Sequence, residues 1–383
     1  MDFDPTDEQL ALQDSVRRFA SERLNDDLVA RDRAGGFSRK LWEECAVFGL
    51  QGLPVPTQHG GQGADLLTTS LAMEALGESC HDGGLIFSLN AHLWSAALPL
   101  VEFGTPEQQA DHLPQMCDGS KIAVHAITEP AAGSDAMALT TTARPDGDSY
   151  VLDGTKHFIT NAPEADLFVV FATIDPALAW AGVTAFLVPR GTPGLSTGTG
   201  VEKMGLRTSP TGEVVLRQCR VPARNVLGEP GSGMMVFDYA MRLERACIMA
   251  SAVGLMQRQL DECLIQAEGR RQFGRPIGDF QAVGHTLADM KVRLEAGRLL
   301  SRRAAWLADR GELTASEAGI AKLFLSEAAV QSSLDTVQLH GGHGYMTEAG
   351  LERQVRDAVG ARIYSGTSQM QRNIITAGLR AKA

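Results

Sequence analysis

The stretch LFVVFATIDPALAWAGVTAFLVP, residues 167–189, holds two runs of β-branched, aromatic and aliphatic residues on either side of a Pro- and Gly-containing connection. Such runs, bounded by turn-forming residues, are typical of strands. Similar short runs broken by Gly, Pro, Asp and Thr extend over residues 121–230. We therefore predict a compact, barrel-like antiparallel β-domain over 121–230.

The residues before this β-domain have the spacing of helices. Thr6 begins a capping box for a helix that runs to about Leu24, and Ser38 is placed to cap a second helix that ends near Gly49. Pro106 stands in the first turn of another helix, where proline is favoured. Residues 1–120 are therefore predicted to form a mostly helical domain.

After the β-domain, apolar residues again recur at helical spacing over long segments. Helices are predicted at 234–267, 277–310 and 314–340 and in a final stretch to about residue 380. The predicted fold class is α+β: an N-terminal helical domain (1–120), the central β-domain (121–230) and a C-terminal four-helix bundle (231–383).

Composition restricts the function. The 383 residues carry 35 Lys and Arg against 46 Asp and Glu, and this net charge of −11 argues against non-specific nucleic-acid binding. No run approaches the roughly 20 apolar residues of a membrane span. The six cysteines are dispersed, without a C-x-x-C pair or zinc-type spacing, so we expect no metal site and a reducing compartment. With an acidic N-terminus that lacks the features of a secretory signal, the expected location is cytoplasmic.

Common nucleotide and nucleophile motifs are missing or misplaced. There is no G-x-G-x-x-G after a predicted strand and no G-x-x-x-x-G-K-[ST], which argues against a Rossmann dehydrogenase or a P-loop enzyme. Residues 194–198, GLSTG, match G-x-S-x-G, but no helix follows them as a nucleophile elbow requires.

Four segments have both a functional and a structural interpretation. AITEPAAGSD (126–135) and HFITNA (157–162) end predicted strands, and each fits either close approach to a flat cofactor or an ordinary turn and core. GGHGY (341–345) either ends a helix or lets the backbone approach a phosphate. The turn around Phe273 carries three arginines, Arg270, Arg271 and Arg275. They either are solvated at the surface or bind a phosphate group.

Glu244 is the most informative single residue. It interrupts an otherwise mostly apolar helix face that consists of Phe237, Met241, Ile248, Ser251 and Leu255. Burying an unpaired carboxylate is costly, and such a site suits a general base that works near neutral pH. The alternative is an ion pair with Arg242 or Arg245.

Seven segments taken together resemble the acyl-CoA dehydrogenase flavoprotein family. They are AITEPAAGSD, HFITNAPEADLF, KMGLRTSPTGEVVLRQCRVPARNVLG, LERACIMASAVGLMQ, GRRQFGRPIGDFQ, QLHGGHGY and IYSGTSQMQRNI. The resemblance covers essentially the whole chain, in the same order, and implies the acyl-CoA dehydrogenase fold. It also implies FAD as cofactor and a homotetramer built as a dimer of dimers.

The resemblance assigns cofactor contacts residue by residue. Those implied around the isoalloxazine ring are Ile127, Thr128, Ser134, Phe158 and Thr160. Those implied on the adenine and pyrophosphate side are Arg270, Gln272, Phe273 and Gln281, with Gln338, Gly341 and Gly342 from a neighbouring subunit and Thr367 and Gln369 nearby.

Substrate contacts are implied for Ser134, Arg245, Tyr364, Ser365 and Gly366. Straight-chain members carry their base as Glu in Y-E-G-T, where this chain has Ser365, and a serine hydroxyl is no comparable base. In the isovaleryl- and long-chain-type branches the base is on the helix that matches L-E-R-A, which implies Glu244 as the catalytic base.

Phe158 replaces the Trp of many members. Together with FSLNAHLW and the Y-S-G-T ending, it resembles the branch that oxidises a prolyl thioester on a carrier protein in secondary metabolism. The implied activity is α,β-dehydrogenation of an acyl thioester, on coenzyme A or a carrier protein, with electron-transferring flavoprotein or oxygen as acceptor. The alternatives are a catalytically silent binding or scaffold protein and a flavin oxidase or monooxygenase on the same fold.

Overall fold

The computed structural model describes residues 4–380 and begins with a group of helices. These are α1 (Asp7–Arg23), α2 (Leu28–Ala34), α3 (Arg39–Phe48), α4 (Leu66–Ser79), α5 (Gly83–His92), α6 (Leu98–Phe103) and α7 (Pro106–Cys117). Thr6 caps α1 through the predicted capping box, Ser38 caps α3, and Gly49 ends α3 in a left-handed conformation. The helix starts predicted from these residues are therefore confirmed.

A π-helical segment, Leu93–Ala97, joins α5 to α6 and makes one long helix of Gly83–Phe103. Contrary to the expectation from sequence, this helix is long and apolar enough to cross a membrane by length and composition. Its most apolar window is 83% buried inside the fold, as in a core helix of a globular domain. We therefore assign it to the core.

The central domain is one eight-stranded sheet. Its strands are β1 (Ala123–Ala126), β2 (Thr142–Asp146), β3 (Ser149–Thr160), β4 (Leu167–Thr173), β5 (Val183–Pro189), β6 (Leu195–Thr197), β7 (Thr211–Pro222) and β8 (Val226–Leu227). The order β6-β7-β3-β2-β4-β5-β8, with β1 on β4, is an open path and not a closed barrel. β1 and β2 pair with β4 in parallel, so the antiparallel prediction holds for the other pairs only.

The parallel pairs follow from connections that hairpin signals do not reveal. Between β1 and β4 the chain forms the β2–β3 hairpin and then returns, so β4 enters the sheet in the same direction as β1. β4 is buried at all of its residues, which explains why its sequence is continuously apolar and does not alternate.

The C-terminal helices are α8 (Gly233–Cys247), α9 (Ala250–Gly269), α10 (Gln281–Asp309), α11 (Ala315–His340), α12 (Leu351–Gly360) and α13 (Ser368–Arg380). The single helix predicted at 234–267 is wrong, because the chain breaks at Ile248 and Met249. Ser251 Oγ donates to the Ile248 carbonyl, a side-chain bond that competes with the helical ladder. A short hairpin, β9 (Arg271–Gln272) and β10 (Arg275–Pro276), connects α9 to α10.

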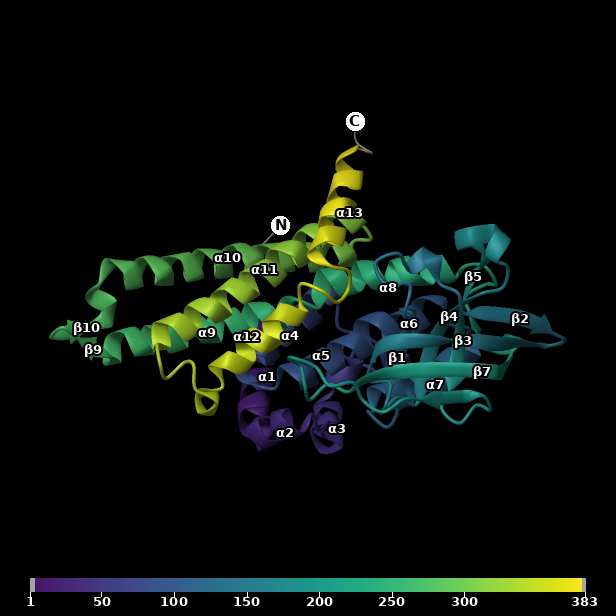
Figure 1. Cartoon of the computed structure of the whole chain (residues 1–383), viewed down its shortest axis with the longest axis horizontal. Helices are drawn as coiled ribbons and strands as arrows, with labels where there is room; N and C mark the ends of the chain where they lie inside the picture. Colours follow the sequence, from purple (N-terminus) through teal and green to yellow (C-terminus); the bar gives the residue numbers. More distant parts are fainter. Residues whose placement is uncertain (1–3, 381–383) are drawn as a thin grey trace.

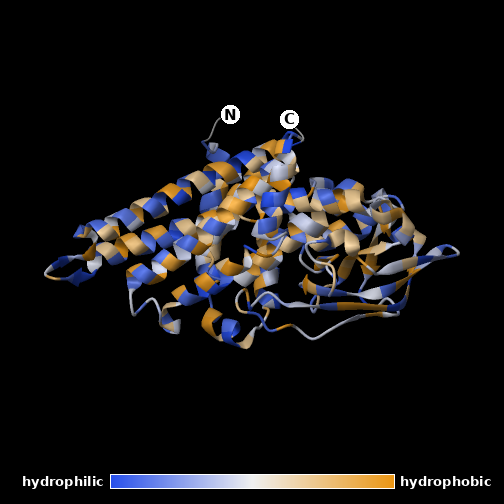
Figure 2. Ribbon diagram, turned by 45° about the horizontal axis from the view of Figure 1, so that its top comes forward, coloured by the Kyte–Doolittle hydropathy of each residue, from blue (hydrophilic) through white to orange (hydrophobic). Residues whose placement is uncertain are grey.

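The sheet and the long helices lie at opposite ends of an elongated molecule (Figure 1). The β9–β10 hairpin projects at the helical end, and β2, β3 and β7 lie at the other end. Hydrophobic residues gather where the helices of the N-terminal and C-terminal parts face one another (Figure 2). The strands of the β9–β10 hairpin are mostly hydrophilic (Figure 2). The largest core cluster joins residues of α1, α4 and α5 to residues of α9, α10 and α11.

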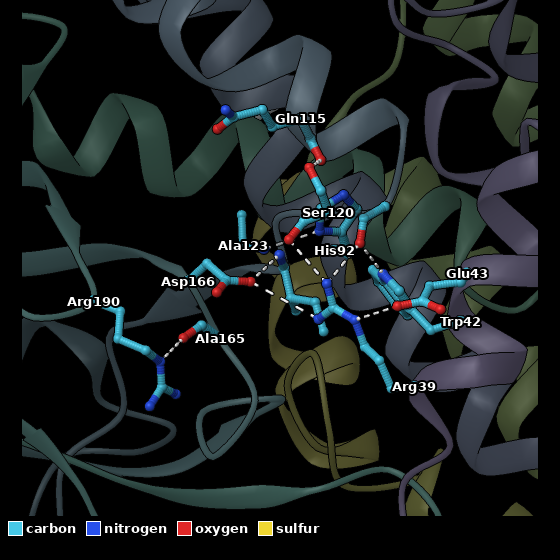
Figure 3. A network of polar contacts seen from close by, with 12 residues as sticks. Arg39, Trp42, Glu43, His92, Gln115, Ser120, Ala123, Ala165, Asp166 and Arg190 are labelled. Carbon is cyan, nitrogen blue, oxygen red and sulfur yellow. Dashed lines mark hydrogen bonds and ion pairs between the residues drawn. The ribbon is translucent and has the colours of Figure 1, made fainter.

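A polar network fastens the N-terminal helices to the sheet (Figure 3). Arg39 donates to the carbonyls of Gly119 and Ser120 at 3.0 and 2.9 Å. Asp166 accepts from the backbone of Ile122 at 2.8 Å, and the Ala123 amide donates to His92 Nδ1 at 3.1 Å. These bonds fix the direction in which β1 leaves the helical part.

Two glycines allow α4 and α9 to pack with their backbones in contact. A Cβ atom at Gly254 would lie 1.9 Å from the Glu74 carbonyl oxygen, and one at Gly77 would lie 1.9 Å from the Ser251 carbonyl oxygen. Any side chain at either position therefore forces the two helices apart. This crossing joins the N-terminal helices to the C-terminal ones.

Gly254→Ala should destabilise the protein, because the added methyl group collides with the α4 backbone. We expect a loss of about 1–3 kcal/mol or more in the free energy of unfolding, measured by urea titration. Gly284→Ala is the matched control, since no described heavy atom lies within 4 Å of its Cβ position in α10. That change should be neutral or stabilising by about 0.5–1 kcal/mol. Equal effects of the two substitutions would contradict this account of the crossing.

Candidate active site

Glu244 lies near the end of α8, only 8% exposed, between two serine hydroxyls. Ser95 Oγ donates to Oε2 and Ser365 Oγ donates to Oε1. The alternative of an ion pair is not realised in the described residues: Arg242 pairs with Asp238 at 2.9 Å, and Arg245 donates to the Ser365 carbonyl at 3.0 Å. The carboxylate is therefore buried, held at both oxygens and free of a direct cationic partner.

Ser95 reaches Glu244 from the π-helical segment Leu93–Ala97. Pro99 follows four residues later and has no N–H to give to the Ser95 carbonyl, which loosens the helix at this point. The Ser95 carbonyl is 3.2 Å from His125 Nδ1 on β1. Burial lowers the pKa of His125 to about 4, so its ring is neutral at neutral pH and donates through Nδ1.

Ser365 reaches Glu244 from a tight turn between α12 and α13. Ser365 has φ +55° and Gly366 has φ +90°, so two successive residues are left-handed. A non-glycine residue in this region is strained and persists only where its surroundings hold it. Arg245 and Gln371 both donate to the Ser365 carbonyl, at 3.0 and 3.1 Å.

A pocket lies next to the two segments that carry Glu244 and Ser365, and it is lined by Ile248, one turn after Glu244, and by Tyr364, the neighbour of Ser365. Its apolar wall includes Ile248 and Phe87, and the Phe87 ring packs at a tilt against the Tyr364 ring, with 4.6 Å between their centroids. Burial, with a smaller contribution from the Glu244 charge, raises the pKa of Tyr364. The pocket therefore offers mostly apolar surface close to a buried carboxylate.

A second polar cluster supports the strand ends on the β-domain. Lys156, fully buried on β3, lies 2.8 Å from Glu129 Oε1 and donates to the Ile127 carbonyl at 3.2 Å. Burial alone raises the pKa of Glu129, but hydrogen bonds from Lys156, Thr141 and Thr140 outweigh it and lower this pKa to about 2. The loop after β1 is therefore held by an ionised, fully hydrogen-bonded carboxylate.

Phe158 stands beside this loop with its ring turned outward. A β-bulge interrupts the pairing of β3 and β7 between Lys156 and Ile159, and Phe158 takes φ +57° there. Its side chain is 60% exposed although it stands in a strand with an apolar core. The His157 amide donates to the Thr128 carbonyl at 2.8 Å, which brings the ends of β1 and β3 together. An exposed aromatic at a bulge is typical of a binding site.

The structure divides the predicted cofactor residues into separate groups. Ile127, Thr128, Ser134, Phe158 and Thr160 gather at the ends of β1 and β3 and the loop after β1. Arg270, Gln272, Phe273 and Gln281 lie at the hairpin between α9 and α10, at the opposite end of the molecule (Figure 1). Gln338, Gly341 and Gly342 end α11, and Thr367 and Gln369 begin α13 beside the Tyr364–Gly366 turn. One copy of the chain therefore does not bring all these residues together.

Sequence reasoning missed Ser95, Lys156 and the helix break after Glu244. The signal for Ser95 was present, because Pro99 inside an apolar helical run predicts a local disturbance four residues earlier. No signal identified Lys156, since a single lysine in a strand gives no indication that it is buried.

Lys156→Met should destabilise the protein, because it leaves the Glu129 carboxylate buried without its cation. The expected cost at neutral pH is on the order of 3–5 kcal/mol in the free energy of unfolding. Because the folded-state pKa of Glu129 is depressed, the stability it contributes is present above about pH 4.5 and is lost as the pH falls towards 2. The difference between wild type and variant should therefore shrink on acidification.

Urea unfolding at a series of pH values measures this difference. Lys40→Met, at an exposed lysine, is the control and should unfold like the wild type. If the difference in unfolding free energy between wild type and Lys156→Met stayed constant from pH 7 to pH 3, it would contradict the role given to the Lys156–Glu129 pair.

Comparison with family models matches nearly the whole chain to three parts of one family. Residues 6–120 match the acyl-CoA dehydrogenase N-terminal domain, 125–219 the middle domain and 231–380 the C-terminal domain. The helical, β and helical order of the structure is the order of these three matches. The boundaries at 120/121 and 230/231 remain a prediction.

Two curated relatives are L-prolyl-[peptidyl-carrier protein] dehydrogenases. The one from Pseudomonas fluorescens is 44% identical over 99% of this chain and 100% of its own length, and the one from Serratia is 40% identical over 98% and 97%. The human short-chain specific acyl-CoA dehydrogenase is 41% identical over 98% of this chain and 90% of its own length.

Solved structures agree with these relatives. A crystal structure of the prolyl acyl carrier protein oxidase AnaB has a TM-score of 0.97 and 44% identity, over 98% of this chain and 100% of that one. A structure of PigA with FAD and proline has a TM-score of 0.97 and 39% identity, over the full length of both chains. The chain therefore belongs to the acyl-CoA dehydrogenase family.

Proposed function

We propose that this protein is an FAD-dependent dehydrogenase of an acyl group carried as a thioester on a carrier protein, and that the acyl group is L-prolyl. The observation that carries the proposal is Glu244, a buried carboxylate held by two hydroxyls beside a mostly apolar pocket. Relatives named as prolyl-carrier-protein dehydrogenases, similar over the full length, support the choice of substrate.

Glu244 is suited to remove the α-proton of the thioester. A carboxylate oxygen accepts more than one hydrogen bond, so each oxygen retains capacity beyond the bond from Ser95 or Ser365. The serine hydroxyls hold the carboxylate in one orientation before the transfer. Because a hydroxyl both donates and accepts, it can rotate to accommodate the neutral carboxyl group afterwards. Orientation of this kind is a large part of catalysis by a general base.

Ser365 stands where straight-chain relatives carry a glutamate base, and we assign it a different task. Its hydroxyl donates to the Glu244 carboxylate, which supports a base on α8 that the serine holds in place. Arg245 binds the carbonyl of the same serine and does not neutralise Glu244 directly. This arrangement favours an active enzyme over a catalytically silent family member.

Residues towards the two ends of the molecule fit FAD. Phe158 offers an exposed ring beside a loop of small residues, which suits the isoalloxazine ring. At the hairpin, Phe273 is 93% exposed between Arg271 and Arg275, which suits an adenine ring and a pyrophosphate. Bound there, FAD supplies the acceptor for the β-hydride.

A second copy of the chain is needed to complete such a site. α10 has 29 residues and spans roughly 43 Å, and it separates the hairpin at its start from Asp309 at its end, which binds the backbone of α4. We infer that the hairpin of one subunit reaches the strand ends of its partner, in a dimer that pairs again into a tetramer. The neighbouring subunit then supplies the hairpin residues to each FAD site, in addition to Gln338, Gly341 and Gly342.

The acceptor and location complete the proposal. Electron-transferring flavoprotein or oxygen reoxidises the flavin, and the word oxidase in the name of AnaB favours testing oxygen first. We place the protein in the cytoplasm, because all six cysteines are free and buried, as expected of a reducing compartment.

Anaerobic titration tests the proposed function. L-prolyl carrier protein should bleach the visible flavin band of the wild type, and Glu244→Gln should keep FAD bound but reduce the flavin about 10²- to 10⁴-fold more slowly, as expected when a general base is lost. Asp238→Asn, on the exposed side of the same helix, is the control and should behave as wild type.

The other outcomes discriminate the alternatives. Bleaching by a short acyl-CoA but not by the carrier-bound substrate would move the enzyme to ordinary acyl-CoA oxidation. No bleaching by any thioester would favour a silent member. Hydrogen peroxide without a desaturated product would indicate a different flavin reaction.

Complementation between two inactive variants tests the shared site. Glu244→Gln and the hairpin double variant Arg270→Ala/Phe273→Ala should each be inactive alone. A mixed dimer contains one site with both intact parts, so an equal mixture refolded or coexpressed should recover about a quarter of the wild-type activity. Recovery is measured as flavin reduction per mole of subunit, relative to the wild type. A mixture no more active than its components would show that each chain completes its own site.

A further inference from the structure

Lys322 is buried in the middle of α11 with no solvent exposure, and the mechanism above does not use it. Its ammonium group donates to the Gly366 carbonyl at 2.7 Å. In the described residues no carboxylate lies within ion-pair distance of it, and fully buried lysines without such a partner are rare. Its place in the core therefore calls for an explanation.

The carbonyl that Lys322 binds belongs to the turn that presents Ser365. Gln371 donates to the same Gly366 carbonyl at 2.8 Å and to the Ser365 carbonyl at 3.1 Å, and Arg245 donates to the latter. Two charged groups and one amide thus bind two consecutive carbonyls. Their convergence accounts for the persistence of the left-handed conformation at Ser365, which costs conformational energy in a residue other than glycine.

The surroundings of Lys322 connect it to the base. Burial lowers its pKa to about 8, the charge of Arg245 adds to this, and the charges of Glu244 and Glu327 oppose it. Glu327 is engaged elsewhere, by Ser368 at 2.7 Å and by Arg362 at 2.9 Å. The Tyr364 ring centroid is 5.8 Å from the ammonium nitrogen. Lys322 therefore binds the turn directly, and the negative charge of Glu244 raises the pKa of its ammonium group.

We propose that Lys322 is a positioning residue for proton abstraction: by holding the Gly366 carbonyl it keeps Ser365 left-handed, with its hydroxyl on Glu244. The proposal rests on the proposed role of Glu244 as the base. Without the ammonium group the strained turn relaxes, the Ser365 hydroxyl leaves the carboxylate, and Glu244 loses one of its two orienting bonds. Lys322 is not among the residues that line the pocket, so in this proposal it acts through the turn.

A double-mutant cycle tests this route of action. Lys322→Met fills the volume without a donor, and Ser365→Ala removes the hydroxyl. Each should slow anaerobic flavin reduction on the order of 10- to 100-fold, with FAD retained and the dissociation constant of the substrate nearly unchanged. If Lys322 acts through Ser365, the double variant should be little slower than either single variant. The proposal would be overturned if the rate losses of the two single variants multiplied in the double variant, or if Ser365→Ala had no effect on the rate.

Controls separate positioning from general damage. Ser326→Ala, one helical turn further along α11 at an equally buried site, should reduce flavin at the wild-type rate. If Lys322→Met yields no holoenzyme, Lys322→Gln takes its place in the cycle, because it keeps a polar group and adds no bulk.

A crystal structure of the Lys322 variant provides a readout independent of turnover. We expect Ser365 to leave the left-handed region and its hydroxyl to move away from Glu244, while α8 and α11 stay in place. An unchanged turn would overturn the proposal even in an active enzyme. Failure of the wild type to react with any thioester would instead refute the proposed function, so the two failures are distinguishable.

Discussion

The burial of one carboxylate, Glu244, is the constraint on which the site depends. An ionised group removed from water needs hydrogen bonds at both oxygens, and α8 itself offers none. The chain supplies them from two remote segments, Ser95 in the helix Gly83–Phe103 and Ser365 in the turn before α13. Three elements that are far apart in sequence must therefore meet at a single point.

Each of the three elements departs from regular geometry where it meets the others. The helix that carries Ser95 widens into a π-segment, α8 ends just after Glu244 at the Ile248–Met249 break, and Ser365 is left-handed. Each departure costs free energy on its own, so the surrounding contacts must stabilise it. Irregularities of unrelated kinds at one point are better explained by a functional requirement than by chance. Phe158, left-handed in a β-bulge, is a further example at the β-domain end.

The fold was predictable from sequence to the extent that it depends on local signals. The caps at Thr6 and Ser38 and the apolar runs of β4 and β5 act over a few residues, and the structure confirms the elements they predict. The parallel pairing of β1 with β4 was not predictable, since it depends on where the chain returns after a hairpin. Local signals also gave the helical, β, helical order of the three parts, which agrees with the order of the family matches.

The same distinction applies to the site. Glu244 was identifiable because a charge on an apolar helix face is a local anomaly, but its partners were not, because a serine 149 residues away in the chain gives no sign of its contact. Lys156 and Lys322 could not be identified from the sequence for a related reason. Lysine is ordinarily exposed, and only the carbonyl or carboxylate that it meets in three dimensions explains its burial.

The two buried lysines follow one physical rule at opposite ends of the active region. Each donates to a backbone carbonyl in an irregular segment: Lys156 to Ile127 in the loop after β1, and Lys322 to Gly366 in the turn before α13. A cation with several donors can hold such a segment more firmly than a neutral group, because charge-assisted hydrogen bonds are stronger and their strength grows as water is excluded. Lys156 has a buried carboxylate to balance its charge, and its network is complete within the β-domain. In the part of the chain that the structure describes, Lys322 donates to one carbonyl oxygen, and the charges around it, of which Glu244 is one, are more distant. Lys156 therefore has its partner within the β-domain, whereas the carbonyl that Lys322 holds belongs to the turn that places the Ser365 hydroxyl on Glu244.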